Sequence, residues 1–328
     1  MSRGGIARNL VHTPAELATE YVEWAQSIRD NPGIPFGVPS VDKKVIPMRP
    51  GELISLIGRP GSAKTSLMAY LAKRTAVGIQ ERGASEIEAV VYVTWEQSAE
   101  ELANFFLADG DYDIGEVAWG RMPMEKVMRQ AVHGGKIPLW VIGHGIGRAG
   151  LKVPRMTPDV VLSAIESMEE DFGVKPILMC FDYMQLIPVA NIRDRVQQVT
   201  EAPIRIKELA LRIGCPALVA VQASRNVDER QVKLPGMADA QWASSIEQTS
   251  DKAFGLWRPA TTEKELSLIP LDGEDHIVCD TLLIMRMLKQ RGASPNGQWA
   301  LYFHPALMQL AAMVRPSDQE PRRISSGR

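Results

Sequence analysis

The sequence predicts an α/β protein built on a mostly parallel β-sheet with helices on both faces. Short apolar runs alternate with amphipathic segments along most of the chain, which is the pattern of repeated strand–helix units. The first of these runs leads into a Gly-rich loop that opens a helix. The last runs have no helix between them, which predicts an antiparallel extension of the sheet. At 328 residues the chain is long enough to bury a full core.

The composition is that of an ordinary globular protein. Apolar residues make up 45% and charged residues 23%, and the formal net charge is -2, so a nucleic-acid partner would have to meet a local basic lining. Cys180, Cys215 and Cys279 lack metal-ligand spacing and are expected to be small buried thiols in a reducing cytoplasm. No stretch approaches the roughly 18 apolar residues that cross a bilayer, and the N-terminus lacks the apolar core of a secretory signal. We therefore expect a cytoplasmic protein with no membrane partner.

An amphipathic helix is expected over residues 13–30. Thr13 can cap it, Pro14 suits the first helical position, and Glu16 can close a capping box. Two partners are open for its apolar stripe: the protein's own core or a neighbouring subunit. The stripe consists of Leu17, Tyr21, Trp24, Ala25 and Ile28.

The remaining elements follow from hydrophobic periodicity. Strands are expected at 52–57, 89–94, 138–142, 176–181, 217–222, 252–257, 281–287 and 299–303. Helices are expected from residue 65 to about 76, from near 98, from 157 to 172, and over 200–212. This gives an N-terminal segment over 1–33, one main domain over 34–315 and a polar tail over 316–328 that we expect to be disordered.

A phosphate-binding loop is the most specific motif. It follows the first strand and opens a helix, and it has the pattern G-x-x-x-x-G-K-[ST] except that Ala63 replaces the second Gly. Backbone N–H groups would wrap the phosphates of a nucleoside triphosphate, Lys64 would reach the β- and γ-phosphates, and Thr65 would ligate Mg²⁺. We expect Ala63 to cost little, because the first turn of a helix gives it a helical φ. The loop comprises Gly58, Arg59, Pro60, Gly61, Ser62, Ala63, Lys64 and Thr65.

Polar residues lie at or shortly after the ends of four predicted strands. Asp182 ends a buried run, where an acid can hold Mg²⁺. Glu96 can activate an attacking water, or it can be a helix N-terminal acid. Gln222 can sense the γ-phosphate, or it can cap a strand end. Lys289 and Arg291 can clamp phosphate charge, or they can form a solvated charged turn, which spacing alone favours.

Together these motifs resemble one family over about residues 34–310. The strings GRPGSAKTSLMAYLA, VVYVTWEQSAEELANFFLA, FDYMQLI, VAVQASR, SSIEQTSD and MLKQRGASPNG are similar to those of DnaB-type replicative helicases, in their C-terminal RecA-like ATPase domain. The resemblance implies ATP and Mg²⁺ as cofactors and Glu96 as the catalytic glutamate. It also implies that Asp182 serves the metal and Gln222 the sensor role. Arg291, with Lys289, would be an arginine finger that acts on the nucleotide of a neighbouring subunit in a homo-oligomer, by resemblance a hexamer.

The resemblance has two departures. The family's N-terminal domain, which serves the collar and primase contacts, is not matched, and the helix over 13–30 could stand for the linker helix that docks on the next subunit. In the DNA-facing loop, the family often has an Arg-Glu pair where this chain has Gln241 and Trp242. Trp242 could stack on a base or belong to the core. Further candidates for DNA contact in predicted loops are Arg193, Arg195, Arg225, Arg230 and Lys233.

The first functional hypothesis is thus a ring-forming ATPase that moves on single-stranded DNA, a DnaB-like helicase with a possible loader or primase partner. The alternative is a RecA-like ATPase switch or scaffold in a phage, mobile-element or defence context, without unwinding; the unmatched domain and the altered loop favour it. A small-molecule kinase is a weaker third idea, since the SSIEQTSD and MLKQRGASPNG strings argue against it.

Overall fold

The computed structural model describes residues 11–108, 112–146, 155–190, 192, 194–241, 243–271 and 274–312. These residues form a nine-stranded sheet with the order β11-β10-β9-β6-β1-β5-β4-β2-β3, and a separate two-stranded hairpin β7-β8. The strands are β1 (Leu53–Gly58), β2 (Glu88–Thr94), β3 (Leu139–Ile142), β4 (Lys175–Asp182), β5 (Ala217–Gln222), β6 (Lys252–Trp257), β7 (Leu268–Leu271), β8 (Glu274–Ile277), β9 (Leu282–Gln290), β10 (Gln298–His304) and β11 (Gln309–Ala312).

Strands β1 to β6 run parallel, and β9 to β11 extend the sheet in antiparallel fashion, as the sequence predicts. All six residues of β1 are buried, since both faces of the sheet are covered. Alternate residues serve two cores: Ile54 and Leu56 face one, and Leu53 and Ile57 face the other.

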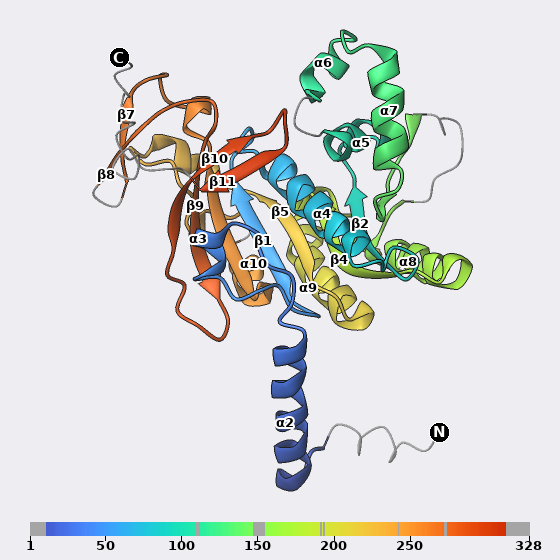
Figure 1. Ribbon diagram of the computed structural model, residues 1–328. Coiled ribbons are helices and arrows are strands. Elements are labelled where there is room, and N and C mark those ends of the chain that lie inside the picture. The colour runs from blue at the N-terminus through green and yellow to red at the C-terminus, as the bar shows by residue number, and fades with distance from the viewer. Residues whose placement is uncertain are drawn as a thin grey trace, which may run out of the picture.

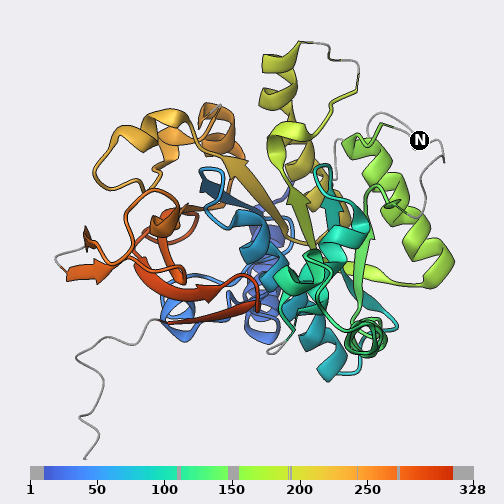
Figure 2. The ribbon, with the colours of Figure 1, turned by 90° about the horizontal axis from the view of Figure 1, so that it is seen from above.

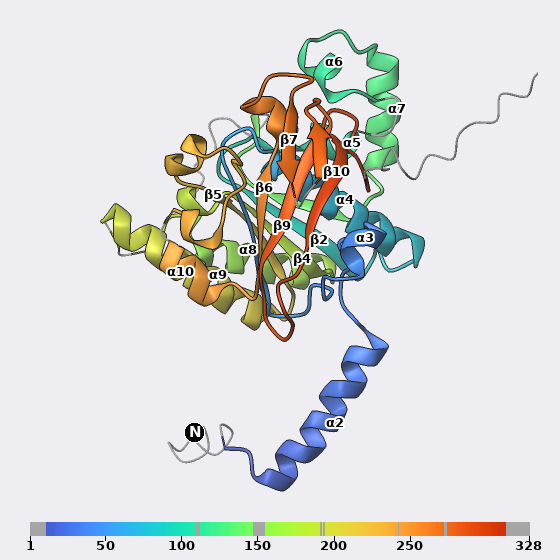
Figure 3. The same cartoon turned by 90° about the vertical axis from the view of Figure 1, so that its left-hand side faces the viewer.

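The helices divide between the two faces (Figure 3). Helix α4 covers one face, and α8, α9 and α10 cover the other. The helices are α2 (Pro14–Asp30), α3 (Pro39–Asp42), α4 (Lys64–Glu81), α5 (Ala99–Leu107), α6 (Ile114–Ala118), α7 (Met124–Gly134), α8 (Pro158–Phe172), α9 (Arg195–Ile213) and α10 (Ala243–Thr249). In the described part of the chain, none of them is long and apolar enough to cross a membrane.

Several elements differ from the sequence prediction. Helix α4 continues to Glu81, and α9 begins at Arg195 and accommodates Pro203 in its interior. Helices α3, α6, α7 and α10 and the β7–β8 hairpin were not predicted, because short elements with mixed polarity lack a clear period. The predicted tail over 316–328 lies outside the described residues.

Helix α2 extends away from the rest of the molecule (Figure 1). It has the predicted capping box between Thr13 and Glu16, yet it buries no residue. Leu17, Tyr21 and Trp24 are exposed, and the rings of Tyr21 and Trp24 are 5.7 Å apart. The sequence left two partners open for this helix, and the structure shows that it does not pack on the protein's own core.

Candidate active site

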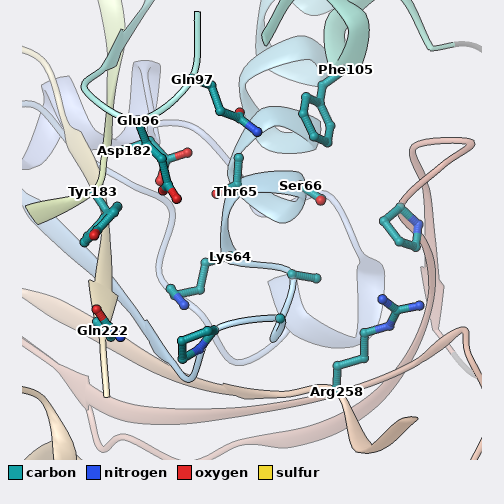
Figure 4. A pocket seen from close by; sticks show the side chains of 14 residues that line it. Lys64, Thr65, Ser66, Glu96, Gln97, Phe105, Asp182, Tyr183, Gln222 and Arg258 are labelled. Carbon is teal, nitrogen blue, oxygen red and sulfur yellow. The ribbon is translucent and has the colours of Figure 1, made fainter. Parts of the chain in front are cut away.

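A pocket of about 430 Å³ lies where the parallel strands β1, β2, β4 and β5 end, at the edge seen from above in Figure 2. The pocket brings together residues from four predicted motifs (Figure 4). Its lining comprises Pro60, Gly61, Ala63, Lys64, Thr65, Ser66, Glu96, Gln97, Phe105, Asp182, Tyr183, Gln222, Arg258 and Pro305. Convergence of strand ends on one crevice is the usual site geometry of open α/β sheets.

The loop between β1 and α4 is shaped by two glycines. Gly61 has φ of +79°, and a Cβ at Gly58 would lie 2.1 Å from Ser62 Oγ, so neither position accepts a side chain freely. Lys64 Nζ donates hydrogen bonds to the carbonyl oxygens of Gly58 and Arg59, each at 2.9 Å. The Lys64 ammonium is therefore held inside the loop that is predicted to surround the phosphates.

Ala63 does not have the helical φ expected from the sequence. Its φ and ψ are +63° and 26°, so it is left-handed and serves as the N-cap of α4. The expectation was wrong because the loop keeps the backbone path that the usual Gly requires. A left-handed Ala costs roughly 1–2 kcal/mol relative to a right-handed one.

Substituting Ala63→Gly is expected to raise the free energy of unfolding by about 1 kcal/mol, since Gly adopts this φ without a Cβ clash but loses more chain entropy. Thermal or urea unfolding would measure the change. The control is Ala76→Gly, a buried position inside α4, which should destabilise the protein. Equal destabilisation by both substitutions would contradict a strained Ala63.

Asp182 has the surroundings of a metal-site carboxylate. Its side chain is almost fully buried at the end of β4, and the fully buried Tyr92 donates its hydroxyl to Oδ2 at 3.1 Å. Burial raises the pKa of Asp182, and the charge of Glu96 raises it further. Hydrogen bonds from Thr65 and Tyr92 and the charge of Lys64 act in the opposite direction without cancelling the rise. A carboxylate beside the Thr65 hydroxyl and the phosphate loop fits hydrated Mg²⁺, which takes few protein ligands.

Glu96 is exposed to the pocket on a turn, and the residues before and after it are held in place by hydrogen bonds. Before it, Trp95 donates its backbone N–H to Asp182 O at 3.0 Å and stacks on Phe181. After it, Gln97 N donates to Thr94 Oγ1 at 3.1 Å. In Figure 4 Glu96 lies beside Asp182 on the same side of the pocket. It is not in the capped first turn of α5, where Ser98 and Glu101 form the capping box.

Burial lowers the pKa of Lys64 to about 8, although Asp182 and Glu96 raise it, and Arg59 lowers it further. Below pH 8 the ammonium is charged and ready for a triphosphate. Above pH 8 it is increasingly neutral, so binding must take up a proton.

We therefore expect the affinity for a nucleoside triphosphate to fall as pH rises above about 8, by at most about tenfold per pH unit. Titration calorimetry between about pH 7 and pH 9.5 would measure the affinity and the proton uptake. Lys64→Arg stays charged and should flatten the pH profile. Equal affinity across this range in the unsubstituted protein would contradict the low pKa.

Gln222 ends β5 and borders both the pocket and the following loop. Its N–H donates to Gln185 Oε1 at 3.2 Å, and its carbonyl accepts from Gln185 Nε2 at 3.4 Å and from the Gln241 N–H at 3.1 Å. The Gln222 side chain lines the pocket (Figure 4). Gln222 thus lines the pocket and is also hydrogen-bonded to Gln241, at the far end of the loop that follows β5.

Lys289 and Arg291 lie at the opposite edge of the sheet. Arg291 Nη1 is 3.0 Å from Asp251 Oδ1, and Asp251 Oδ2 accepts the Leu53 N–H at 2.9 Å, where β1 begins. Lys289 Nζ donates to Glu247 O, and burial lowers the pKa of Lys289. Since β1 rises about 3.3 Å per residue, Arg291 is roughly 17 Å from the end of β1 and from the pocket of its own chain.

The candidates for DNA contact differ in their surroundings. Arg225 is exposed in the 3₁₀ turn Arg225–Glu229. Arg230 pairs with Asp239 at 2.6 Å, and Lys233 pairs with Glu263, so both cations are engaged by carboxylates. Arg193, Trp242 and the side chain of Arg195 lie outside what the structure describes.

Sequence reasoning missed part of the pocket. Arg258, directly after β6, lines it and donates from Nε and Nη2 to Asp280 O at 3.0 and 2.8 Å. Phe105 on α5 lies on the side of the pocket away from Gln222 (Figure 4), and Pro305 after β10 adds apolar surface to the lining. A polar residue directly after a sixth parallel strand was the signal that could have identified Arg258.

Comparison with known proteins places this site in a family. A family model described as DnaB-like helicase C terminal domain matches residues 33–312. The chain belongs to this family. The matched residues include strands β1 to β11 and every residue that lines the pocket.

Two curated relatives are bacterial replicative DNA helicases. DnaC of Bacillus subtilis (strain 168) is 28% identical over 243 residues, which cover 72% of this chain and 49% of the relative. DnaB of Geobacillus stearothermophilus is 28% identical over 233 residues, which cover 69% and 47%. The chain therefore spans about half the length of the curated relatives that it matches.

Two solved structures share the fold. One, described as an ATPase domain, has a TM-score of 0.71 at 18% identity, covering 92% of this chain and 99% of that one. A DnaB-like replicative helicase, described together with its interactions with primase, has a TM-score of 0.69 at 18% identity, covering 93% and 67%. Both confirm a RecA-like arrangement of the parallel sheet.

Proposed function

We propose that this chain is a ring-forming, ATP-hydrolysing motor that acts on single-stranded DNA, as a DnaB-like helicase. One observation carries the proposal. The pocket holds Lys64, Asp182 and Glu96, whereas the cation Arg291 lies a strand length away at the opposite edge of the sheet. The site is therefore completed by Arg291 only if a second copy supplies it.

The proposed roles follow from position. Glu96 polarises a water for attack on the γ-phosphate, and Lys64 neutralises charge between the β- and γ-phosphates. Thr65 and Asp182 hold Mg²⁺, which supplies further charge neutralisation when bound. Gln222 senses the γ-phosphate. Arg291, with Lys289 beside it, stabilises the transition state in the neighbouring subunit.

Two apolar stripes that are exposed in the described part of the chain support assembly with further copies. One is the exposed stripe of α2, formed by Leu17, Tyr21 and Trp24. The other is on α7, where Met124, Met128 and Val132 recur at helical spacing and are all more than 60% exposed. We propose that α2 of one subunit docks on another subunit of a homo-oligomer, by family resemblance a hexamer.

Membership of the helicase family does not favour the alternative of a switch or scaffold without unwinding. We propose Arg225, which is exposed three residues after Gln222, as a DNA contact. The loop around Gln241 and Trp242 and the region of Arg193 and Arg195 are proposed as further contacts. A primase or loader as partner, a cytoplasmic location, and the division into an N-terminal segment, an ATPase domain over 34–315 and a tail stay proposals.

For such a motor we expect single-stranded DNA to raise the ATPase rate severalfold, and we expect unwinding of a forked duplex in the presence of Mg²⁺ and ATP. Hydrolysis can be followed by phosphate release and unwinding by strand separation. ATPase stimulation without strand separation would favour a switch. No response of the assembled protein to DNA in either assay would overturn the motor.

A further inference from the structure

The side chain of Arg59 turns away from the phosphate pocket, although the residue belongs to the phosphate loop. Its Nε lies 3.0 Å from each carboxylate oxygen of Asp228, and Nη2 is 2.8 Å from Asp228 Oδ2. Its Nη1 donates to Ala223 O at 3.1 Å. Such a forked contact fixes the position of a guanidinium more firmly than a single hydrogen bond. Arg59 therefore joins the phosphate loop to the segment that follows Gln222.

The backbone of Arg59 contacts the residue that serves the phosphates. Lys64 Nζ donates to the carbonyl oxygens of Gly58 and Arg59. Phosphate oxygens of a bound triphosphate would compete with these two carbonyls for the protons of Lys64. Arg59 is thus placed to respond to the engagement of Lys64 and to transmit the response through its own side chain.

On the far side of the Arg59–Asp228 pair, residues 224–239 are held together by hydrogen bonds and are called the 224–239 body below. The Asp239 carboxylate accepts hydrogen bonds from both terminal nitrogens of Arg230 at 2.6 Å and from the N–H of Gly236 at 2.7 Å. The backbone carbonyl of Asp239 accepts a hydrogen bond from the N–H of Ser224 at 2.7 Å. These bonds hold residues 224–239 together from both ends. The same body presents the exposed Arg225.

We propose that the Arg59–Asp228 ion pair couples the phosphate loop to the 224–239 body, so that DNA on this body changes the hydrolysis rate in the same subunit. The inference rests on the proposed function, because it names how DNA regulates that site. Only the side chains form the link, since Arg59 serves the phosphate loop through its backbone and its guanidinium is engaged by Asp228. Loss of the pair should reduce the coupling and leave the two binding sites in place.

The test compares two neighbouring carboxylates of the full chain. Asp228→Asn removes the charge that holds Arg59, whereas Glu229→Gln removes one charge from the next residue, which is also exposed and makes no described contact with Arg59. Both substitutions change the net charge of the loop alike, so a general effect on DNA affinity would appear in both. The ATPase rate is measured with and without a single-stranded oligonucleotide, and thermal unfolding verifies the fold.

We expect Asp228→Asn to keep the rate measured without DNA and to lose about fivefold or more of the stimulation, within the usual range of coupling between two sites. Glu229→Gln should be stimulated like the unsubstituted protein. By linkage, the difference in oligonucleotide affinity between the complexes with ADP and with a slowly hydrolysed ATP analogue should shrink in Asp228→Asn alone.

Three outcomes would overturn the inference. If Asp228→Asn is stimulated as strongly as the unsubstituted protein, the ion pair does not couple the sites. If Glu229→Gln loses the same stimulation, the cause is loop charge. If Arg59→Met and Asp228→Asn have fully additive effects on stimulation, they do not act through one pair. If the unsubstituted protein shows neither stimulation by DNA nor strand separation, the proposed function itself fails.

Discussion

Substituting Glu96→Gln is expected to lower the turnover number for ATP hydrolysis by about 10³-fold while ATP binding persists, since a positioned base contributes roughly 10²–10⁴-fold. The amide has the same size as the carboxylate and leaves the contacts of the neighbouring Trp95 and Gln97 unchanged. Steady-state phosphate release and equilibrium binding of a fluorescent ATP analogue would separate the two effects.

A matched control for Glu96 is Glu100→Gln, one turn further on, at an exposed position outside the pocket lining. It should retain near-normal turnover. Normal hydrolysis by Glu96→Gln would remove Glu96 from its catalytic role. Loss of binding together with hydrolysis would instead assign it to nucleotide binding.

Removing the guanidinium with Arg291→Ala is expected to lower turnover by about 10³-fold or more, which is the usual contribution of an arginine finger. Asp251 keeps Lys207 Nζ at 2.5 Å and the Leu53 N–H as partners, so its buried carboxylate is not left alone. Arg212→Ala is the matched control, because Arg212, like Arg291, is 64% exposed and, among the described residues, pairs with one carboxylate, Glu166. It should leave turnover unchanged.

Mixing subunits tests whether the finger acts in a neighbour. Arg291→Ala subunits retain a complete phosphate loop, and Lys64→Ala subunits retain the finger. A mixed assembly therefore contains some complete sites, and mixtures should recover part of the activity that each variant lacks alone. Inactivity at every ratio, once mass measurement proves that mixed assemblies form, would contradict a finger supplied by a second copy.

The sequence predicted the elements that have strong periodicity or a rigid chemical requirement. The eight apolar runs became strands of the main sheet, and the loop with Lys64 and Thr65 lies between a strand and a helix as its chemistry requires. Asp182, Glu96 and Gln222 meet in one pocket because the carboxyl ends of parallel strands share an edge.

Other features depend on contacts between distant segments, and no local pattern contains them. Ala63 keeps a left-handed φ because of the loop path, and periodicity cannot show this. The partners of Arg59, Arg230 and Lys233 are carboxylates that come from elsewhere in the fold or loop. Arg258 enters the pocket because β6 lies beside β1, an adjacency that the chain order does not reveal.

The central claim is that each active site is shared between two copies of this chain. The most direct test measures the ATPase rate per subunit over a range of protein concentrations, alongside the mass of the assembly in the presence of Mg²⁺ and nucleotide. We expect the rate per subunit to rise as oligomers, by family resemblance hexamers, replace monomers. A monomer that hydrolyses ATP at the full rate per subunit would contradict the shared site.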